Sequence, residues 1–323
     1  MSPDPATIET GLSELIGSAV TITGAASVGA QRSTLYIDID RDGEIEAAVA
    51  QISGTVIESR PATGEAELIE LAAAAGVPVP TVYAVTDDLS GVGAPAMVVS
   101  KADGRTIPRH ILRGITDDAA GDRLAHQCGA ALARLHTVGR AEIPGHVPTT
   151  LSESFVDLQE ERLELLPAPH PAIRFGIRWL RDNPIADPEP RMVHGDFRNG
   201  NIVVDDDGLV AVLDWEVAQA SDPMQDLAWL CLRTWRFGAD DRPVGGFGSL
   251  AALIDGYESA SGEFRSEAFH WWSVARSVWW AVGLGGQSAA FTRGLTDSIV
   301  LAASGRRVPE LEYDLLRLLA TGR

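Results

Sequence analysis

The stretch RMVHGDFRNGNIVVDDDGLVAVLDWE, residues 191–216, decides the fold because it interrupts a helical pattern that runs on both sides of it. It reads as a short apolar strand, a polar loop and a hairpin that turns at DDDG. Within it, Asn201 follows Asp196 by five residues and Asp214 follows Asp196 by eighteen. A loop followed by a returning hairpin predicts that these three side chains share one cleft.

The three residue types suit the chemistry of phosphoryl transfer. That reaction needs a carboxylate that accepts or orients the proton of an attacking hydroxyl, and oxygen ligands for Mg²⁺ at the nucleotide phosphates. We predict Asp196 as the base, and Asn201 and Asp214 as the Mg²⁺ ligands. Taken singly, each is also a common turn or cap residue. The joint pattern of strand, loop, spacing and hairpin favours the catalytic interpretation.

Length and charge restrict the classes of protein that this chain can be. Its 323 residues predict two domains or lobes. The 26 Lys and Arg against 45 Asp and Glu give a formal net charge of −19, and Lys101 is the only lysine. Because binding to nucleic acids and to anionic membranes depends on basic residues, we expect neither partner.

The cysteines and the termini predict a cytoplasmic protein. Cys128 and Cys231 are far apart and lie in no Cys/His cluster, which argues against disulfides and zinc sites. The first residues lack the basic and apolar segments of a secretory signal. Uncharged runs such as residues 277–292 are shorter than the ~20 apolar residues that span a bilayer.

The chain divides into two parts with different residue patterns. Residues 1–103 are rich in alternating and β-branched residues, and they predict five strands with one helix over residues 62–76. Residues 104–323 predict mainly helices, apart from the strand, loop and hairpin quoted above. We therefore predict an N-lobe over residues 1–103 that ends in a hinge, and a C-lobe over residues 104–323.

The motif HGDFRNGN followed by LDWE resembles the aminoglycoside phosphotransferase and choline kinase-like branch of the protein-kinase-like superfamily. The segments GVPVPTVYAV, GRTIPRHILRG, QCGAALARLH and DPMQDLAWLCLRTWRFG share this resemblance. It extends over nearly the whole chain and is strongest to a bacterial group related to phosphotransferases that accompany acyl-CoA dehydrogenases.

The resemblance implies a two-lobed α+β fold, with a small antiparallel sheet and one helix in the N-lobe and a mostly helical C-lobe. It implies an enzyme that transfers the γ-phosphoryl group of ATP to a hydroxyl of a small molecule, with ATP and Mg²⁺ as cofactors. Asp226 would brace the catalytic loop and His194 would be its structural partner. The hinge that meets adenine would consist of Val99, Ser100, Lys101 and Ala102.

The nucleotide-covering part departs from the family pattern. The family places a basic residue on the third strand, where it holds the α/β-phosphates and pairs with a helix glutamate. Glu65 occupies the glutamate position, but Gln51 stands where Lys or Arg is expected. Arg32, next to a segment that resembles the family's glycine-rich loop (GAASVGAQ, without the lysine of a Walker A motif), or Arg60 could reach the phosphates instead. Glu65 could equally be a first-turn acid that the helix dipole favours.

Candidates for the acceptor site are less specific. Acidic side chains on one side of a helix over residues 152–166 could bind a cationic substrate, although such runs are more often solvated faces. Several tryptophans could line an acceptor pocket, although helical spacing favours a place in the core. The candidates are Asp157, Glu160, Glu161, Glu216 and Trp272.

Two other classes of function stay open at this point. One is a nucleotide-binding pseudokinase or regulatory module, which Gln51 favours. The other is a helical binding protein for acyl or CoA-like ligands. The set of Asp196, Asn201 and Asp214 argues against both, because neither class needs a base and two metal ligands.

Overall fold

The computed structural model describes residues 4–28, 32–53 and 60–321. The chain forms two compact units. The first, called the sheet unit below, comprises residues 1–105 and 202–217, and the second, called the helical unit, comprises residues 106–201 and 218–323. The hairpin quoted at the outset therefore belongs to the sheet unit, although helical segments flank it in the sequence.

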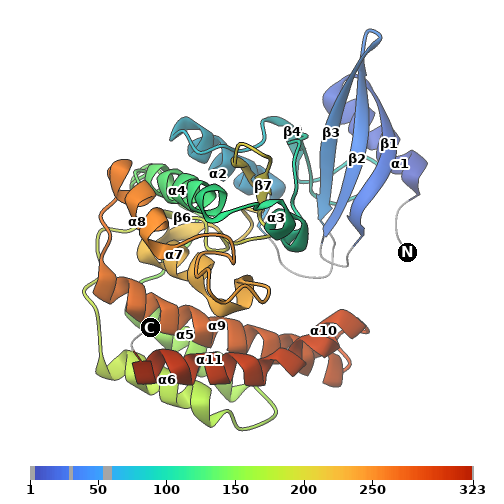
Figure 1. Cartoon of the computed structure of the whole chain (residues 1–323). Coiled ribbons are helices and arrows are strands. Elements are labelled where there is room, and N and C mark those ends of the chain that lie inside the picture. Colours follow the sequence, from blue (N-terminus) through green and yellow to red (C-terminus); the bar gives the residue numbers. More distant parts are fainter. Residues whose placement is uncertain (1–3, 29–31, 54–59, 322–323) are drawn as a thin grey trace. The chain divides into compact units, whose positions relative to one another are not determined.

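The sheet unit is built on five antiparallel strands in the order β1-β2-β3-β5-β4 (Figure 1). Between β2 and β3, Asp42 and Gly43 have φ values of 56° and 92°, the left-handed pair that a tight hairpin turn requires. The prediction of five strands is confirmed. They are β1 (Ala19–Val28), β2 (Arg32–Arg41), β3 (Glu44–Ser53), β4 (Val82–Thr86) and β5 (Ala96–Ser100).

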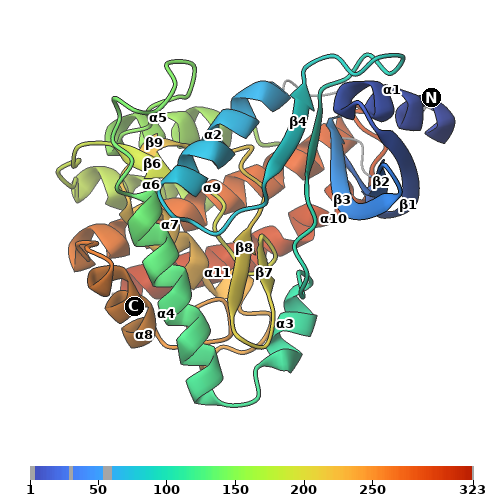
Figure 2. The ribbon, with the colours of Figure 1, turned by 90° about the horizontal axis from the view of Figure 1, so that it is seen from above.

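Two helices accompany this sheet, which corrects the prediction of one. The predicted helix is α2 (Ala62–Ala74), which packs along β4 (Figure 2). The additional helix is α1 (Pro5–Ile16), which contacts β1. It begins with a proline in the first turn and ends at Gly17 in the left-handed conformation, two helix-boundary signals that outweigh the polar character of this segment. Leu12 anchors it, fully buried in the core of the sheet unit.

The short hairpin of β7 (Ile202–Val204) and β8 (Leu209–Val212) completes the sheet unit, and it confirms the predicted hairpin. The backbone N–H of Val212 donates to the carbonyl of Pro78 at 2.8 Å, and Arg105 forms a bridge with Val204. These bonds tie the hairpin to the segments that follow α2 and β5.

The helical unit contains one short strand pair and most of the helices. β6 (Arg191–Val193) pairs with β9 (Gln219–Ser221), a pairing between segments on either side of the hairpin. The helices are α3 (Pro108–Gly114), α4 (Asp118–Leu135), α5 (Ser152–Glu164), α6 (Pro171–Asp182), α7 (Met224–Cys231), α8 (Leu250–Ser259), α9 (Ser266–Thr292), α10 (Ile299–Ser304) and α11 (Val308–Thr321).

The longest helix, α9, packs against α5, α6, α7, α10 and α11 and so forms the centre of this unit (Figure 1). It continues through the sequence GLGGQS, which on propensity alone disfavours a helix. A Cβ at Gly285 would come within 2.9 Å of the side chain of Leu166, so the glycine permits a close contact. Packing therefore overrides local propensity in this stretch.

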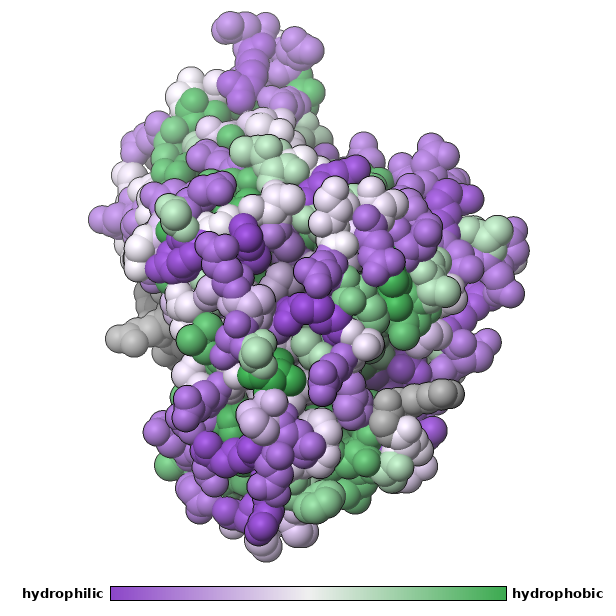
Figure 3. Space-filling view, turned by 90° about the vertical axis from the view of Figure 1, so that its left-hand side faces the viewer, coloured by the Kyte–Doolittle hydropathy of each residue, from purple (hydrophilic) through white to green (hydrophobic). Residues whose placement is uncertain are grey.

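Within the described residues, no helix is both long and apolar enough to cross a membrane. The face shown in Figure 3 is mostly hydrophilic, with hydrophobic side chains in scattered groups. Such a surface agrees with the acidic composition of the chain.

Candidate active site

The loop after β6 carries the motif residues His194, Gly195 and Asp196, and a buried carboxylate fixes its backbone. Asp226, at the start of α7, accepts hydrogen bonds from the backbone N–H of His194 at 2.7 Å and of Gly195 at 2.8 Å. His194 is fully buried, and its Nδ1 lies 3.1 Å from the backbone N of Asp196. The structure thus brings together the two residues predicted to support the loop.

A second histidine completes the surroundings of Asp226. The Nε2 of His136 lies 3.3 Å from Asp226 Oδ2, and its Nδ1 lies 2.9 Å from the hydroxyl of Tyr257. Complete burial by itself raises the pKa of Asp226. The hydrogen bonds and positive potential of His136 and His194 lower this pKa by more than burial raises it, so the net shift is downward. Asp226 is therefore a buried carboxylate held in its charged form.

The carboxylate of Asp196 accepts hydrogen bonds from three side chains. The indole N–H of Trp229 reaches Oδ1 at 2.7 Å, and the Nε of Arg198 lies 3.0 Å from the same atom. Asn201 donates its amide to Oδ2 at 2.7 Å and to the backbone carbonyl at 3.0 Å. These donors give the carboxylate one orientation, which a base in a transfer reaction needs.

A fully buried arginine supports the same loop from the middle of α9. The guanidinium of Arg276 lies 4.4 Å from the ring centroid of Trp229 and 4.1 Å from that of Trp279. It donates a hydrogen bond to the carbonyl of Gly195. Burial lowers the pKa of Arg276 to about 10, although the charges of Asp196 and Asp226 act against this shift.

Sequence reasoning missed the roles of Arg198, Trp229 and Arg276. The sequence position of two of them could have indicated a role in the site. Arg198 lies inside the motif, and Trp229 lies less than one helical turn after Asp226. Arg276 had no such indication, because its contact with Gly195 joins positions 81 residues apart.

The sheet unit holds the residues predicted to meet the nucleotide phosphates. Arg32 on β2 forms an ion pair with Glu65 of α2, with Nη1 at 3.1 Å from Oε1. The same Nη1 lies 3.3 Å from the side-chain oxygen of Gln51 on β3. Burial by itself lowers the pKa of Arg32, but the charge and hydrogen bonds of Glu65, together with the charges of Asp214 and Glu216, outweigh it and raise the pKa. Arg32 thus supplies the positive charge at the place where Gln51 supplies none.

The end of the hairpin carries two further carboxylates near this arginine. Asp214 Oδ1 lies 3.8 Å from Arg32 Nη1, and Glu216 Oε2 lies 3.7 Å from Arg32 Nη2. Asp214 has a φ of 68°, which is uncommon for a residue with a side chain and typical of strained functional positions. Arg60, the other candidate for the phosphates, donates to the backbone carbonyl of Trp215 at 3.2 Å.

The segment predicted as the hinge begins on β5 and leaves the sheet unit's strands at Lys101. Val99 pairs with Val49 and Val82, and Ser100 pairs with Ala48. The side chain of Lys101 lies 3.7 Å from Asp103 and 5.9 Å from the ring centroid of Tyr36 on strand β2. Ala102 follows without regular structure. The tip of the segment that resembles the glycine-rich loop, residues 29–31, lies outside the described residues.

The remaining acceptor candidates lie on helices α5 and α9 of the helical unit. On α5, Asp157 and Glu160 both form ion pairs with Arg181 of α6, while Glu161 is exposed. Trp272 is fully buried against Phe155. The acidic side of α5 therefore contacts basic residues of the chain itself.

The residues predicted to hold Mg²⁺ have suitable donor atoms. The amide nitrogen of Asn201 is used by Asp196, so its side-chain carbonyl oxygen is the remaining acceptor atom. Asp214 offers a carboxylate whose side chain is 37% exposed. Among the described residues no group of three or more His, Cys, Asp or Glu forms an all-protein metal site. Mg²⁺ often takes only one or two protein oxygens and completes its shell with phosphates and water.

Comparison with known proteins agrees with this arrangement. Residues 25–262 match the sequence profile described as the phosphotransferase enzyme family. A solved structure from Ralstonia eutropha, named for the aminoglycoside phosphotransferases, superposes with a TM-score of 0.74 at 19% identity, covering 97% of both chains. The GDP complex of an aminoglycoside 2'-phosphotransferase variant gives 0.66 at 17% identity, covering 99% of this chain and 100% of that one. These similarities confirm the predicted protein-kinase-like α+β fold.

Among curated proteins, the mouse protein "Acyl-CoA dehydrogenase family member 10" is 27% identical over 191 residues. The aligned part makes up 56% of this chain and 17% of the mouse protein. The similarity therefore concerns a minor part of that relative's length.

Proposed function

Because the chain belongs to the phosphotransferase enzyme family, we propose that it is a small-molecule kinase that transfers the γ-phosphoryl group of ATP to a hydroxyl group. The observation that carries this proposal is the carboxylate of Asp196, which Trp229, Arg198 and Asn201 hold in one orientation. A purely structural loop residue has no need of three converging donors.

In this proposal Asp196 accepts the proton of the attacking hydroxyl. Its loop is rigid, because Asp226 binds two successive backbone N–H groups and Arg276 binds the carbonyl of Gly195. Rigid placement of the base contributes to rate by limiting the geometries from which the hydroxyl attacks. The loop therefore acts mainly through position.

Arg32 supplies the positive charge that the family's basic residue on the third strand would supply, since this chain has Gln51 at that position. Its ion pair with Glu65 fixes the guanidinium, and its remaining donor capacity serves the α/β-phosphates of the nucleotide. The residues that would hold Mg²⁺ are Asn201 and Asp214. When bound, Mg²⁺ would neutralise charge on the phosphates and orient them for transfer. The hinge residues 99–102 would meet the base of the nucleotide.

The proposal is tested by incubating the protein with MgATP or MgGTP and a panel of small hydroxyl compounds, including aminoglycosides and hydroxyacyl-CoAs. Product is detected as the phosphorylated acceptor by mass spectrometry. The control is Asp196→Asn, in which we expect kcat to fall by about 10²–10⁴-fold while stabilisation by MgATP persists. Equal rates for the wild type and this variant would refute the role of Asp196.

Gln51 supports a second candidate, a pseudokinase that binds nucleotide without transferring phosphate. That function predicts a rise in melting temperature with MgATP and no product with any acceptor. The position of Arg32 favours the kinase, because the positive charge missing from β3 comes from β2.

For either function we propose a cytoplasmic location, which the two buried free thiols of Cys128 and Cys231 support.

A further inference from the structure

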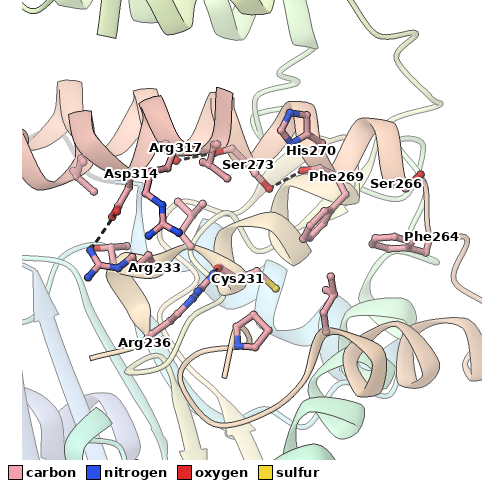
Figure 4. Close-up of a pocket in the computed structure, with 17 residues that line it drawn as sticks. Cys231, Arg233, Arg236, Phe264, Ser266, Phe269, His270, Ser273, Asp314 and Arg317 are labelled. Atoms are coloured by element: carbon pink, nitrogen blue, oxygen red, sulfur yellow. Dashed lines mark hydrogen bonds and ion pairs between the residues drawn. The ribbon is translucent and has the colours of Figure 1, made fainter. Parts of the chain in front are cut away.

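The helical unit contains a cavity of about 550 Å³ whose lining includes none of the proposed catalytic residues (Figure 4). Its walls come from the end of α7 and the segment that follows it (residues 231–236), from the first half of α9 and from α11. Ser273 and Ser277 of α9 line it, whereas Arg276 on a neighbouring face of the helix stacks on Trp229. The cavity and the Asp196 loop thus lie against different faces of α9.

One end of the cavity is basic, although the chain as a whole carries a net charge of −19. Three arginines and one aspartate contribute to this end: Arg233, Arg236, Arg317 and Asp314 (Figure 4). Arg233 is already neutralised, because its Nε lies 2.9 Å from Asp240 and its Nη1 lies 3.2 Å from Asp314. With Asp240 counted, three arginines face two carboxylates at this end, and neither carboxylate forms an ion pair with Arg236 or Arg317.

Arg236 and Arg317 contact no carboxylate among the residues that the structure describes. The Nη atoms of Arg236 donate to the backbone carbonyls of Cys231, at 2.8 Å, and Asp240, at 3.2 Å. Its Nε is buried and has no hydrogen-bond partner within residues 4–28, 32–53 and 60–321. Burial also lowers the pKa of Arg236. The carboxylates that act on Arg236, those of Asp240 and Asp314, both form ion pairs with Arg233, so an anion at this place would offset the cost of burying Arg236.

The other end of the cavity is apolar and aromatic. Phe264 and Phe269 lie with their ring centroids 5.3 Å apart and face the same space in Figure 4. Leu250, Leu311 and Leu318 add aliphatic surface. The lining therefore changes from guanidinium groups at one end to hydrocarbon at the other.

We propose that this cavity is a second ligand site that binds a small amphiphilic anion, with a carboxylate or phosphate head at Arg236 and Arg317 and an apolar body against Phe264 and Phe269. Guanidinium groups bind both kinds of head through paired, charge-assisted hydrogen bonds. The volume lies in the range of about 300–1,000 Å³ that is usual for small-molecule sites. The site is separate from phosphoryl transfer, so its occupancy does not depend on the proposed kinase activity.

The test is calorimetric titration of the full chain, without nucleotide, with decanoate, decyl phosphate and 1-decanol. We expect at least one of the two anions to bind about tenfold or more tightly than the neutral alcohol, since a charge-assisted pair contributes about 1.5–3 kcal/mol. The anion that binds more tightly identifies the head group. Butyrate should bind more weakly than decanoate, because it leaves the aromatic end empty.

The decisive variant is Arg317→Met, because Arg317 lines the cavity with a solvent-exposed side chain whose loss we expect the fold to tolerate. We expect about tenfold weaker binding of the anion, while the matched change Arg306→Met, at an exposed arginine outside the cavity, leaves binding unchanged. Absence of binding by both anions at millimolar concentration would overturn the proposal. Equal affinity in the wild type and Arg317→Met would overturn it as well.

Discussion

Arg32 on β2 and Glu65 on α2 form an ion pair in the sheet unit, and Gln51 of β3 accepts a hydrogen bond from the same guanidinium. The family pattern places a basic side chain on the strand that carries Gln51. The chain therefore keeps the helix glutamate and the positive charge, but it takes the charge from the neighbouring strand. Thr34 is the residue of β2 that pairs with Gln51. The backbone of Arg32 therefore lies two residues along β2 from the position opposite Gln51.

From this pair we expect Arg32→Ala to lower kcat/KM for MgATP by about 10- to 100-fold, mainly through KM. The reason is the loss of charge-assisted hydrogen bonds, which contribute about 1.5–3 kcal/mol each. Initial rates at varied MgATP give the two constants. The matched control is Arg41→Ala at the far end of the same strand, where the arginine contacts Glu46.

A second variant separates loss of charge from loss of fold. Adding Gln51→Lys to Arg32→Ala restores a cation on β3, within reach of Glu65. We expect partial recovery of kcat/KM in the double variant. If the double variant stays as slow as Arg32→Ala and both melt at the wild-type temperature, Arg32 does not serve the phosphates.

The sequence predicted those parts of the fold that local pattern determines. The five strands and the β7–β8 hairpin follow from alternation and turn residues, and the structure contains them. The contact of Asp226 with the His194 loop was implied by the family resemblance, and the structure contains it as well. Helix α1 was missed because its polar residues obscured the boundary signals of Pro5 and Gly17.

The contacts that sequence reasoning could not supply join residues far apart in the chain. Arg276 reaches Gly195 across 81 positions, and Trp229 reaches Asp196 across 33. Neither pair has a spacing rule, because the packing of α9 and α7 determines which side chains meet the loop. Arg32 was one of two arginines that the sequence offered for the phosphates, but its ion pair with Glu65 and its hydrogen bond to Gln51 are seen only in the structure.

For the base, we expect Trp229→Phe to reduce kcat by about tenfold and to leave KM for MgATP unchanged. The variant keeps an aromatic ring but removes the donor that lies 2.7 Å from Asp196 Oδ1, so the carboxylate loses one of its three orienting bonds. Steady-state kinetics with the acceptor found in the screen measures both constants. Trp271→Phe is the control, since its indole N–H donates to the backbone carbonyl of Leu180. A similar fall in kcat in both variants would point to general loosening of the helical unit.

The lowered pKa of Asp226 predicts how the stability of the protein depends on pH. Because the folded state lowers its pKa, Asp226 adds stability at any pH above the ordinary aspartate value of about 3.9, and this contribution is lost as the pH falls through the lower folded value. We expect Asp226→Asn to reduce the free energy of unfolding by about 3 kcal/mol at pH 7, since it breaks a buried charged network. Urea unfolding of both proteins between pH 7 and pH 3 measures the difference, which should be constant down to about pH 4 and shrink below it. A difference that does not change below pH 4 would contradict a lowered pKa.

Substitutions of Arg276 test whether α9 positions the catalytic loop. Its guanidinium, held between Trp229 and Trp279, is the described side chain of α9 that bonds to the backbone of the motif, at Gly195. We expect Arg276→Met to lower kcat by about tenfold or more with little change in KM for MgATP, because the loop loses an anchor while the sheet unit is untouched. Arg276→Lys keeps the charge and a single donor, so it should recover part of kcat. Recovery by Lys separates positioning from packing, since Met fills the space as well as Lys does but cannot donate to the carbonyl. Equal kcat for the Met and Lys variants, with melting temperatures also equal, would show that the bond to Gly195 has no part in catalysis.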